Sequence, residues 1–390
     1  MAMQFAHQDN IGVGVAAPAA IPQAPTKRYL LGPVADFWCF GGSALVILPL
    51  LLLVPSAQYK LSVVAAAVFA SHFINNPHFA HSYQIFYRGF AAKAFRGSLG
   101  PVMQARYLFA GVIAPAALAA FFAIAIAQGN LRLLALAGNA MGLFVGWHYV
   151  KQGYGLLMVD CALKRQFFGD REKRLLLLNS YAVWIASWMQ LNLAMARTEL
   201  WGIAYFSFAI PAWLLNAGVA VAATTTLATV AMIVARRRAI GALPTNGIIA
   251  YFVSLYPWLA LILLNPLWIV VVPVLHSLQY LAVVWRFQYN YESAQLARAK
   301  YKDGSLARRI FGGRALGHLA VFSLIGGVLG FAGFWLVPMV LGITVPHDKA
   351  LFGATVFLFV FWVFINVHHY FMDNVMWRRD NTDTKLYLFS

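Results

Sequence analysis

Histidines are the residues with the strongest potential for chemistry, because most of the ten lie within long apolar segments. Ionisable side chains are costly inside a lipid bilayer, so those that occur there usually have a function. Neutral imidazoles together with carboxylates are typical ligands of transition metals. We therefore interpret seven histidines and one aspartate as candidate metal ligands: His72, His78, His81, His148, His276, His368, His369 and Asp373.

Several of these histidines have a polar residue three or four positions later, which places the two on one face of a helix. The sets are His369 with Asp373, His276 with Gln279 and Tyr280, His148 with Lys151 and Gln152, and His78 with His81. A histidine that binds a metal usually donates its second ring N–H to a carboxylate, a carbonyl or a water. Tyr280, Lys151 and Tyr154 are the candidate catalytic residues, as proton donors beside the metal.

The composition indicates which elements position these side chains. Of the 390 residues, 62% are hydrophobic and only 11% are charged. Uncharged apolar runs recur along the chain, and each reaches the roughly 20 residues that a helix needs to cross a bilayer. These runs do not alternate polar and apolar residues, as a membrane β-barrel would. The sequence therefore predicts an all-α, polytopic transmembrane helix bundle that forms a single domain over residues 31–380.

Ten spans are predicted within this domain. They cover residues 37–55, 61–87, 107–128, 132–160, 175–196, 212–235, 246–264, 267–287, 317–342 and 350–376. The Ala-, Pro- and Gln-rich residues 1–30 are expected to be a disordered cytoplasmic leader, and residues 381–390 a cytoplasmic tail. The apolar stretch Trp201–Leu215 is interpreted as an interfacial or re-entrant segment before the sixth span.

The net charge of +17 comes from basic clusters that lie in every second loop. The positive-inside rule assigns those loops to the cytoplasm, together with both termini. Residues 286–316 form the longest of them and are predicted to be a basic cytoplasmic loop or surface helix. Because the basic clusters are separated by apolar spans, their expected partner is anionic lipid and not nucleic acid. A bacterial inner membrane is the expected location.

The predicted topology places the histidines at one level of the membrane. The four spans that carry most of them all run from outside to inside, and each ends at a basic residue. His78 lies ten residues before Arg88, His276 ten before Arg286, His369 nine before Arg378, and His148 sixteen before Lys164. With a rise of about 1.5 Å per residue, most of these imidazoles lie roughly 15 Å from the cytoplasmic boundary. We therefore expect four spans to share one metal site.

Iron is the metal that this ligand set favours, as one or two non-haem ions that activate dioxygen. Two cysteines are too few for a thiolate site, and the zinc-protease motif HExxH is absent. Zinc, copper and haem stay open as cofactors. The expected function is an oxygenase, hydroxylase or desaturase that acts on a hydrophobic small molecule, a lipid or isoprenoid, with a redox partner at the cytoplasmic face. The alternatives are a haem-binding electron-transfer protein and a proton-coupled transporter.

Three strings carry a resemblance: the run from Ser71 to His81, His276-Ser-Leu-Gln-Tyr280 and the run from Asn366 to Arg378. They resemble uncharacterised bacterial multi-span proteins that pair an N-x-P-H-F segment with an H-H-Y-x-x-D-x-x-x-W-R segment. They are also distantly similar to the Brp/Blh membrane carotenoid dioxygenases. That family binds one iron with histidines from several spans and cleaves β-carotene to retinal, so the resemblance implies a membrane iron site. The histidine boxes of di-iron desaturases are absent.

Overall fold

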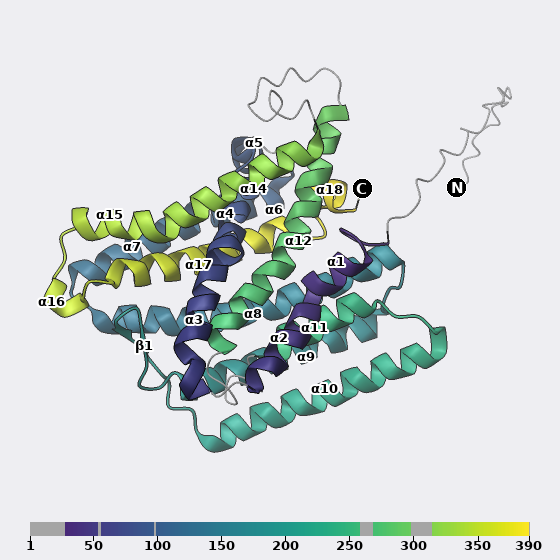
Figure 1. The fold of residues 1–390 in the computed structure, drawn as a ribbon, viewed down its shortest axis with the longest axis horizontal. Helices are drawn as coiled ribbons and strands as arrows, with labels where there is room; N and C mark the ends of the chain where they lie inside the picture. Colours follow the sequence, from purple (N-terminus) through teal and green to yellow (C-terminus); the bar gives the residue numbers. More distant parts are fainter. Residues whose placement is uncertain (1–27, 54–55, 97–98, 258–267, 298–313, 390) are drawn as a thin grey trace, which may run out of the picture.

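The computed structural model describes residues 28–53, 56–96, 99–257, 268–297 and 314–389. Nearly all of these residues are helical (Figure 1), which confirms the predicted all-α class. The sheet seen among them is one short antiparallel hairpin, in which β1 (Glu199–Leu200) pairs with β2 (Ile203–Ala204). The predicted leader falls almost wholly outside the described residues, as does the expected turn at Asn265 and Pro266.

The helices follow one another along the chain with short connections. They are α1 (Pro33–Phe37), η1 (Trp38–Gly42), α2 (Ser43–Leu52), α3 (Ser56–Phe73), α4 (Asn75–Phe86), α5 (Phe90–Phe95), α6 (Pro101–Leu108), η2 (Phe109–Ile113), α7 (Ala114–Ala127), α8 (Leu131–Lys164), α9 (Asp170–Ala194), α10 (Ala212–Ile240), α11 (Thr245–Tyr256), α12 (Trp268–Ala297), α14 (Ala315–Phe331), η4 (Ala332–Leu336), α15 (Val337–Thr344), α16 (Lys349–Phe352), α17 (Val356–Met376) and α18 (Thr382–Leu388). The η segments are wider π-helical turns that continue their neighbours.

Within the described ranges, seven helical segments are long and apolar enough to cross a membrane, which is the signature of an integral membrane protein. They are Pro33–Leu52, Pro101–Ala127, Leu131–Lys164, Ala212–Ile240, Val270–Ala297, Ala315–Thr344 and Val356–Met376. Three predicted spans are not among them. Residues 61–87 are divided between α3 and α4, residues 175–196 lie in the more polar α9, and residues 246–264 begin as α11 and continue outside the described residues. The count of ten spans stays a prediction.

The break between α3 and α4 has a physical cause in the sequence. Pro77 lacks a backbone N–H and its ring clashes with the carbonyl four residues earlier, which belongs to Phe73. Helix α3 ends at Phe73, and Ile74 has φ −120° and ψ −58°, outside the helical region. Helix α4, which carries His78, then starts at Asn75.

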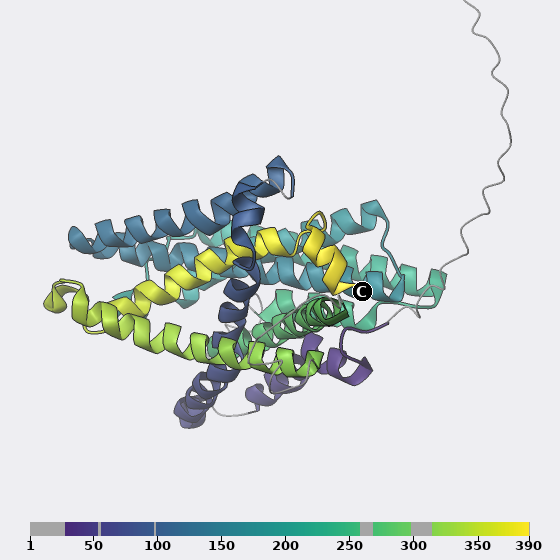
Figure 2. The same ribbon diagram turned by 90° about the horizontal axis from the view of Figure 1, so that it is seen from above.

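Helices α12 and α17 form the centre of the bundle. In their most apolar windows, 67% and 61% of the residues are buried, against 17% for α10 and for the α14–α15 segment. Figure 1 shows α10 at the outside of the bundle, and Figures 1 and 2 show the α14–α15 segment there. Helices α4 and α8 both pack against α17. The central helices are therefore also the ones that carry the histidines.

The loops collect at the two ends of the 34-residue helix α8. At its Lys164 end, the Lys164 ammonium lies 5.6 Å from the Tyr29 ring centroid. Leu30 and Leu388 share one buried cluster, so the two described ends of the chain lie on that side (Figure 1). At the Leu131 end, the Thr355 hydroxyl donates to the Trp201 carbonyl of the β-hairpin.

The structure describes all or part of three segments that the sequence analysis placed outside the regular spans. The Trp201–Leu215 stretch is not a helix at its start: it forms part of the β-hairpin, runs on without regular structure, and enters α10 at Ala212. Residues 286–297 of the predicted basic loop continue helix α12, and residues 298–313 lie outside the described residues. The predicted C-terminal tail folds as α18, where the Tyr387 carbonyl accepts a hydrogen bond from the Asn290 side chain.

Candidate metal centre

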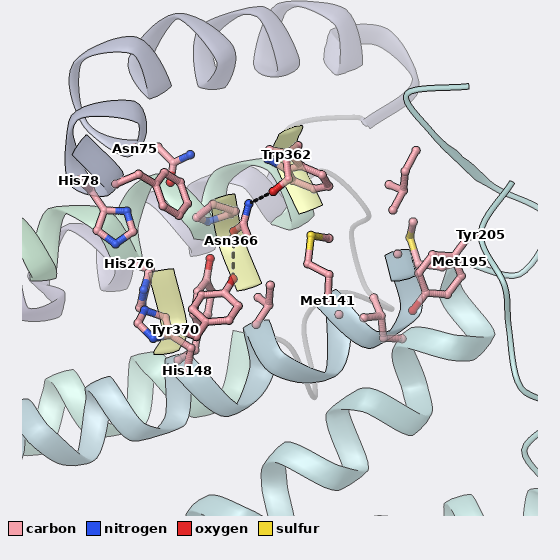
Figure 3. Close-up of a pocket in the computed structure, with 18 residues that line it drawn as sticks. Asn75, His78, Met141, His148, Met195, Tyr205, His276, Trp362, Asn366 and Tyr370 are labelled. Carbon is pink, nitrogen blue, oxygen red and sulfur yellow. Dashed lines mark hydrogen bonds between the residues drawn. The ribbon is translucent and has the colours of Figure 1, made fainter. Parts of the chain in front are cut away.

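Four imidazoles from four helices meet in the centre of the bundle: His78 from α4, His148 from α8, His276 from α12 and His369 from α17. Their ring centroids are separated by 4.4 Å (His78–His369), 4.9 Å (His148–His369), 5.0 Å (His148–His276) and 5.9 Å (His78–His276). None is more than 6% exposed. Figure 3 shows three of them, His78, His148 and His276, turned toward one another at one end of a pocket.

These residues form two groups with metal-binding geometry that share His148. One group is His78, His148 and His276, and the other is His148, His369 and Asp373. In each group, one ligand atom per residue lies within 4.8 Å of the others. Because His148 belongs to both groups, the site could hold one ion bound by residues of both groups, or two adjacent ions.

Six nitrogen atoms of the four rings are buried without a hydrogen-bond partner among the described residues. They are His78 Nε2, His148 Nε2, both nitrogens of His276 and both nitrogens of His369. Buried polar atoms are nearly always paired in folded proteins, and an unpaired one costs about 1–3 kcal/mol. One ligand atom from each residue of a group lies close to those of the others, which indicates that a shared partner pairs with several of these nitrogens, and a metal ion can do so.

The position of His78 is fixed by a hydrogen-bond chain to α12. The Ser277 hydroxyl donates to Asn75 Oδ1 over 2.8 Å, and its oxygen lies 3.2 Å from His78 Nδ1. Because the serine proton is directed to Asn75, Ser277 accepts from the His78 Nδ1–H. The lone pair of this imidazole is then on Nε2, which is the unpartnered nitrogen that faces the other rings.

Asp373 is held by one oxygen and presents the other to the imidazoles. The Tyr280 hydroxyl donates to Asp373 Oδ1 over 2.8 Å and accepts from Trp377 Nε1 at 3.2 Å. Asp373 Oδ2 lies 3.3 Å from His369 Nε2 and 3.9 Å from His148 Nε2. The carboxylate is therefore oriented by α12 and by its own helix before any ligand arrives.

Small residues on α14 let α4 approach closely enough to bring His78 inward. A Cβ on Gly330 would lie 2.7 Å from the backbone carbonyl atoms of Asn76, and one on Gly326 would lie 2.2 Å from the His81 ring. Helices α4 and α14 therefore touch backbone to backbone at this point. His81 points into that helix–helix contact, although it is only three residues from His78.

His368 lies next to His369 in the sequence but apart from the group in space. Its Nε2 donates to the Ala110 carbonyl over 2.8 Å, and its Nδ1 accepts from the Tyr83 hydroxyl over 2.6 Å. Both ring nitrogens are used. Adjacent helix residues point about 100° apart, so only one of the two histidines faces the centre.

His72 and His81 are also outside the group. His72, on α3, accepts from Trp335 Nε1 at 2.9 Å and therefore donates from Nδ1 to the Val68 carbonyl, 2.8 Å away. His81 Nδ1 lies 2.7 Å from Gln84 Oε1. His72 precedes His78 by six residues, which corresponds to about 9 Å along a helix and to a different face, so their closeness in sequence does not bring them to one centre.

The three predicted proton donors have different locations. Tyr280 contacts the centre through Asp373, as described above. Tyr154 is half-buried and packs against a separate apolar cluster that contains Cys161, Leu176 and Tyr251. Lys151 is half-buried, one helical turn from His148, and is not among the residues that line the pocket.

Sequence analysis missed several residues that support the centre. Trp377 follows Asp373 by four positions and Ser82 follows His78 by four, so helical spacing could have indicated both. Two tyrosines had no such signal: Tyr149 stacks on His276 at 3.7 Å and Tyr370 on His148 at 4.5 Å, each from another helix. Their contacts depend on helix packing and are not encoded in local spacing.

A cavity extends from the histidines along α8 toward the β-hairpin. Its volume, as the space open to the centre of a water molecule, is about 90 Å³, several times the roughly 10–15 Å³ that one water needs. Its lining is mainly apolar and includes Met141, Leu191, Met195, Leu200 and Trp362. Figure 3 shows Met195 and Tyr205 at the end opposite to the histidines. The centre is therefore accessible to a molecule larger than water.

Comparison of the chain with protein-family models, curated proteins and solved structures found no match.

Proposed function

We propose that this chain is a membrane-embedded metalloenzyme, a non-haem iron oxygenase, hydroxylase or desaturase that acts on a hydrophobic lipid or isoprenoid substrate. His78, His148, His276, His369 and Asp373 hold one or two iron ions. The convergence of unpartnered, buried imidazole nitrogens from four helices is the observation that carries this proposal. A packing role would leave those nitrogens hydrogen-bonded, as they are in His368.

Iron is favoured over other metals by the second group of ligands. Two histidines and one carboxylate on one side of an ion, with open positions opposite, are typical of non-haem iron oxygenases, and His148, His369 and Asp373 supply that set. Bound iron would supply the one-electron chemistry that activates dioxygen, with electrons from a redox partner at the cytoplasmic face. The three histidines of the first group would also suit zinc. Zinc should therefore be measured together with iron.

The compactness of the group argues against haem between its imidazoles. A haem with two axial histidines needs a flat space between the rings. Asp373 Oδ2 lies 3.3 Å and 3.9 Å from the nitrogens of His369 and His148, in the space that a porphyrin between this pair would need. His148 crowds the other pair, because its ligand atom lies within 4.8 Å of those of His78 and His276.

Side chains around the centre prepare it for metal and substrate. Tyr280 orients the Asp373 carboxylate, and Ser277 keeps the His78 lone pair on the ligating nitrogen. Tyr149 and Tyr370 cover the rings of His276 and His148. The apolar cavity beside them would admit a hydrophobic substrate and reduce the access of water to the reacting atoms.

The proposed membrane topology has ten spans, with both termini in the cytoplasm of a bacterial inner membrane. Its support is the way in which the loops gather. Basic residues of the predicted inner loops meet the chain ends, as in the 2.8 Å ion pair between Lys93 and Asp383. At the opposite end, Thr355, near the outer end of the predicted tenth span, contacts Trp201, which follows the predicted fifth span.

Metal content of the purified protein tests this function. We expect one or two iron ions per chain by mass spectrometry, and no haem Soret band. His148→Ala should remove all bound metal, because His148 belongs to both groups. His276→Ala should remove one ion of two, or weaken a single ion.

His368→Gln is the matched control, because it changes a neighbouring buried histidine whose nitrogens are both engaged elsewhere. It should keep the metal. Each variant must elute from size exclusion like the unchanged protein, so that loss of metal is separated from loss of fold. A protein with no transition metal above trace, or variants that all keep it, would end the proposal.

A further inference from the structure

The cavity beside the histidines follows one face of helix α8. The residues of α8 that line it are Gly138, Met141, Gly142, Val145, His148 and Tyr149, and their offsets from Gly138 of 3, 4, 7, 10 and 11 positions place them on one face of the helix. Ten residues of helix span about 15 Å, so the cavity is elongated and not a spherical hole. The histidines lie at one end, and Tyr205 lies at the other, as Figure 3 shows.

Tyr205 brings a single polar group to the far end. It follows β2, its backbone N–H donates to the Thr198 carbonyl, and it is only 8% exposed. Its hydroxyl is buried and has no hydrogen-bond partner among the described residues. The hydroxyl lies beside α8, 3.2 Å from the position of a Cβ on Gly142. A tyrosine buried in this way usually has a partner, and the cavity is where a ligand could supply one.

The middle of the cavity offers no comparable polar group. The lining also includes the apolar side chains of Met141, Val145 and Trp362, and Leu191 packs beside Tyr205. The amide of Asn366 also lines the cavity, but it donates to the Trp362 carbonyl and accepts from the Tyr370 hydroxyl. The cavity therefore has an apolar passage between a metal-binding end and a hydroxyl end.

We propose that the cavity binds a neutral amphiphile: an apolar chain whose terminal hydroxyl or carbonyl oxygen hydrogen-bonds to Tyr205. No charged side chain is among the residues that line it, and an ionised end group buried without a counter-ion would be strongly disfavoured. The inference rests on the proposed function only at the histidine end of the cavity, where the apolar chain of the ligand would reach the metal site. It narrows the substrate class to long-chain alcohols, aldehydes or ketones, and disfavours a fatty acid whose carboxylate would lie at the Tyr205 end.

Photo-crosslinking tests this assignment in the purified full-length protein in nanodiscs. The probes are three chains of equal length with a central diazirine: a decan-1-ol, a decane and a decanoate. We expect the alcohol to label peptides containing Met141, Leu191 or Met195 at least several-fold more than the other two. Excess unlabelled decan-1-ol should reduce that labelling.

Tyr205→Phe removes only the hydroxyl. It should reduce labelling by the alcohol to the level of the decane and leave decane labelling unchanged. Tyr256→Phe is the matched control, because its hydroxyl pairs with Thr226 outside the cavity, and it should label like the unchanged protein. Equal labelling by alcohol and decane, or no effect of Tyr205→Phe, would mean that water alone pairs with Tyr205 and would overturn the proposal.

Metal content separates the two proposals. Tyr205→Phe should bind as much iron as the unchanged protein, because Tyr205 lies away from the ligands. If the probes fail while iron is present, the substrate class is wrong and the metalloenzyme stands. If iron is absent while the alcohol still labels the cavity, the metalloenzyme is wrong and the neutral-amphiphile site stands.

Discussion

Tyr280 is the side chain that connects two helices at the centre of the bundle. From α12 it donates a 2.8 Å hydrogen bond to Asp373 on α17, and Trp377 donates to it in turn. A carboxylate held by one oxygen keeps the other in a fixed direction. Tyr280 therefore orients the metal ligand Asp373 and does not itself need to contact the metal.

Tyr280→Phe should weaken metal binding without removing any ligand. Loss of a group that orients a metal ligand typically costs about 10- to 100-fold in affinity, and we expect that range for the iron dissociation constant measured by competition with a chelator. Tyr83→Phe is the control, because it also removes a buried hydroxyl, but one that bonds to His368 outside the centre. Equal affinities for the two variants would show that the Tyr280–Asp373 bond does not prepare the site.

Residue types and spacing predicted that histidines from separate helices come together, but not which of the histidines do so. The sequence predicted that histidines from four spans meet at one depth, and the structure brings His78, His148, His276 and His369 together. It could not separate His369 from His368, because that depends on how far each helix is rotated about its axis. Nor could it indicate Tyr205, whose role follows from a non-helical segment that places it beside α8.

At the scale of elements, the contact between α4 and α14 places His78. A Cβ on Gly330 would lie 2.7 Å from the Asn76 carbonyl carbon and oxygen and 2.9 Å from the Pro77 nitrogen. These are backbone atoms, so they cannot move aside by a change of rotamer. The helix break at Pro77 and the glycines of α14 together let α4 enter the bundle.

Gly330→Ala should therefore destabilise the protein and disturb the centre together. Overpacking of this kind costs about 1–3 kcal/mol, and a shift of Asn76 and Pro77 moves His78, so iron occupancy should fall as well. Gly327→Ala, on the same helix, is the control because no atom lies within 4 Å of its added Cβ. Thermal unfolding in detergent and metal analysis measure both effects. Similar unfolding temperatures for the two variants would contradict this account of the helix contact.

The sequence predicted helices well where long apolar runs decide the structure, and less well where packing does. It predicted a second span over residues 61–87 with a kink caused by Pro77, and the structure interrupts this stretch only at Ile74, between α3 and α4. The predicted fifth span, α9, is not among the seven apolar helices, because Asn179, Gln190 and Asn192 make it more polar; its status as a span stays a prediction. Asn179 bonds to Tyr251 on α11, a contact that becomes visible only when the helices are assembled.

For the whole molecule, the uneven distribution of positive charge leads to a prediction about orientation. Arg171 is the second residue of α9 and belongs to a predicted inner loop. Lys349 begins α16 in a predicted outer loop, and both side chains are exposed. With Cys39 and Cys161 first replaced by alanine, we expect a membrane-impermeant maleimide to label Lys349→Cys in intact bacterial cells. Arg171→Cys should react only after the cells are permeabilised, because basic loops stay in the cytoplasm.

The reverse pattern would invert the topology, and labelling of both in intact cells would place the two loops on one side. In either case the histidines would lose their assignment to the cytoplasmic half of the membrane, and a soluble reductant could no longer be expected to reach them from that side.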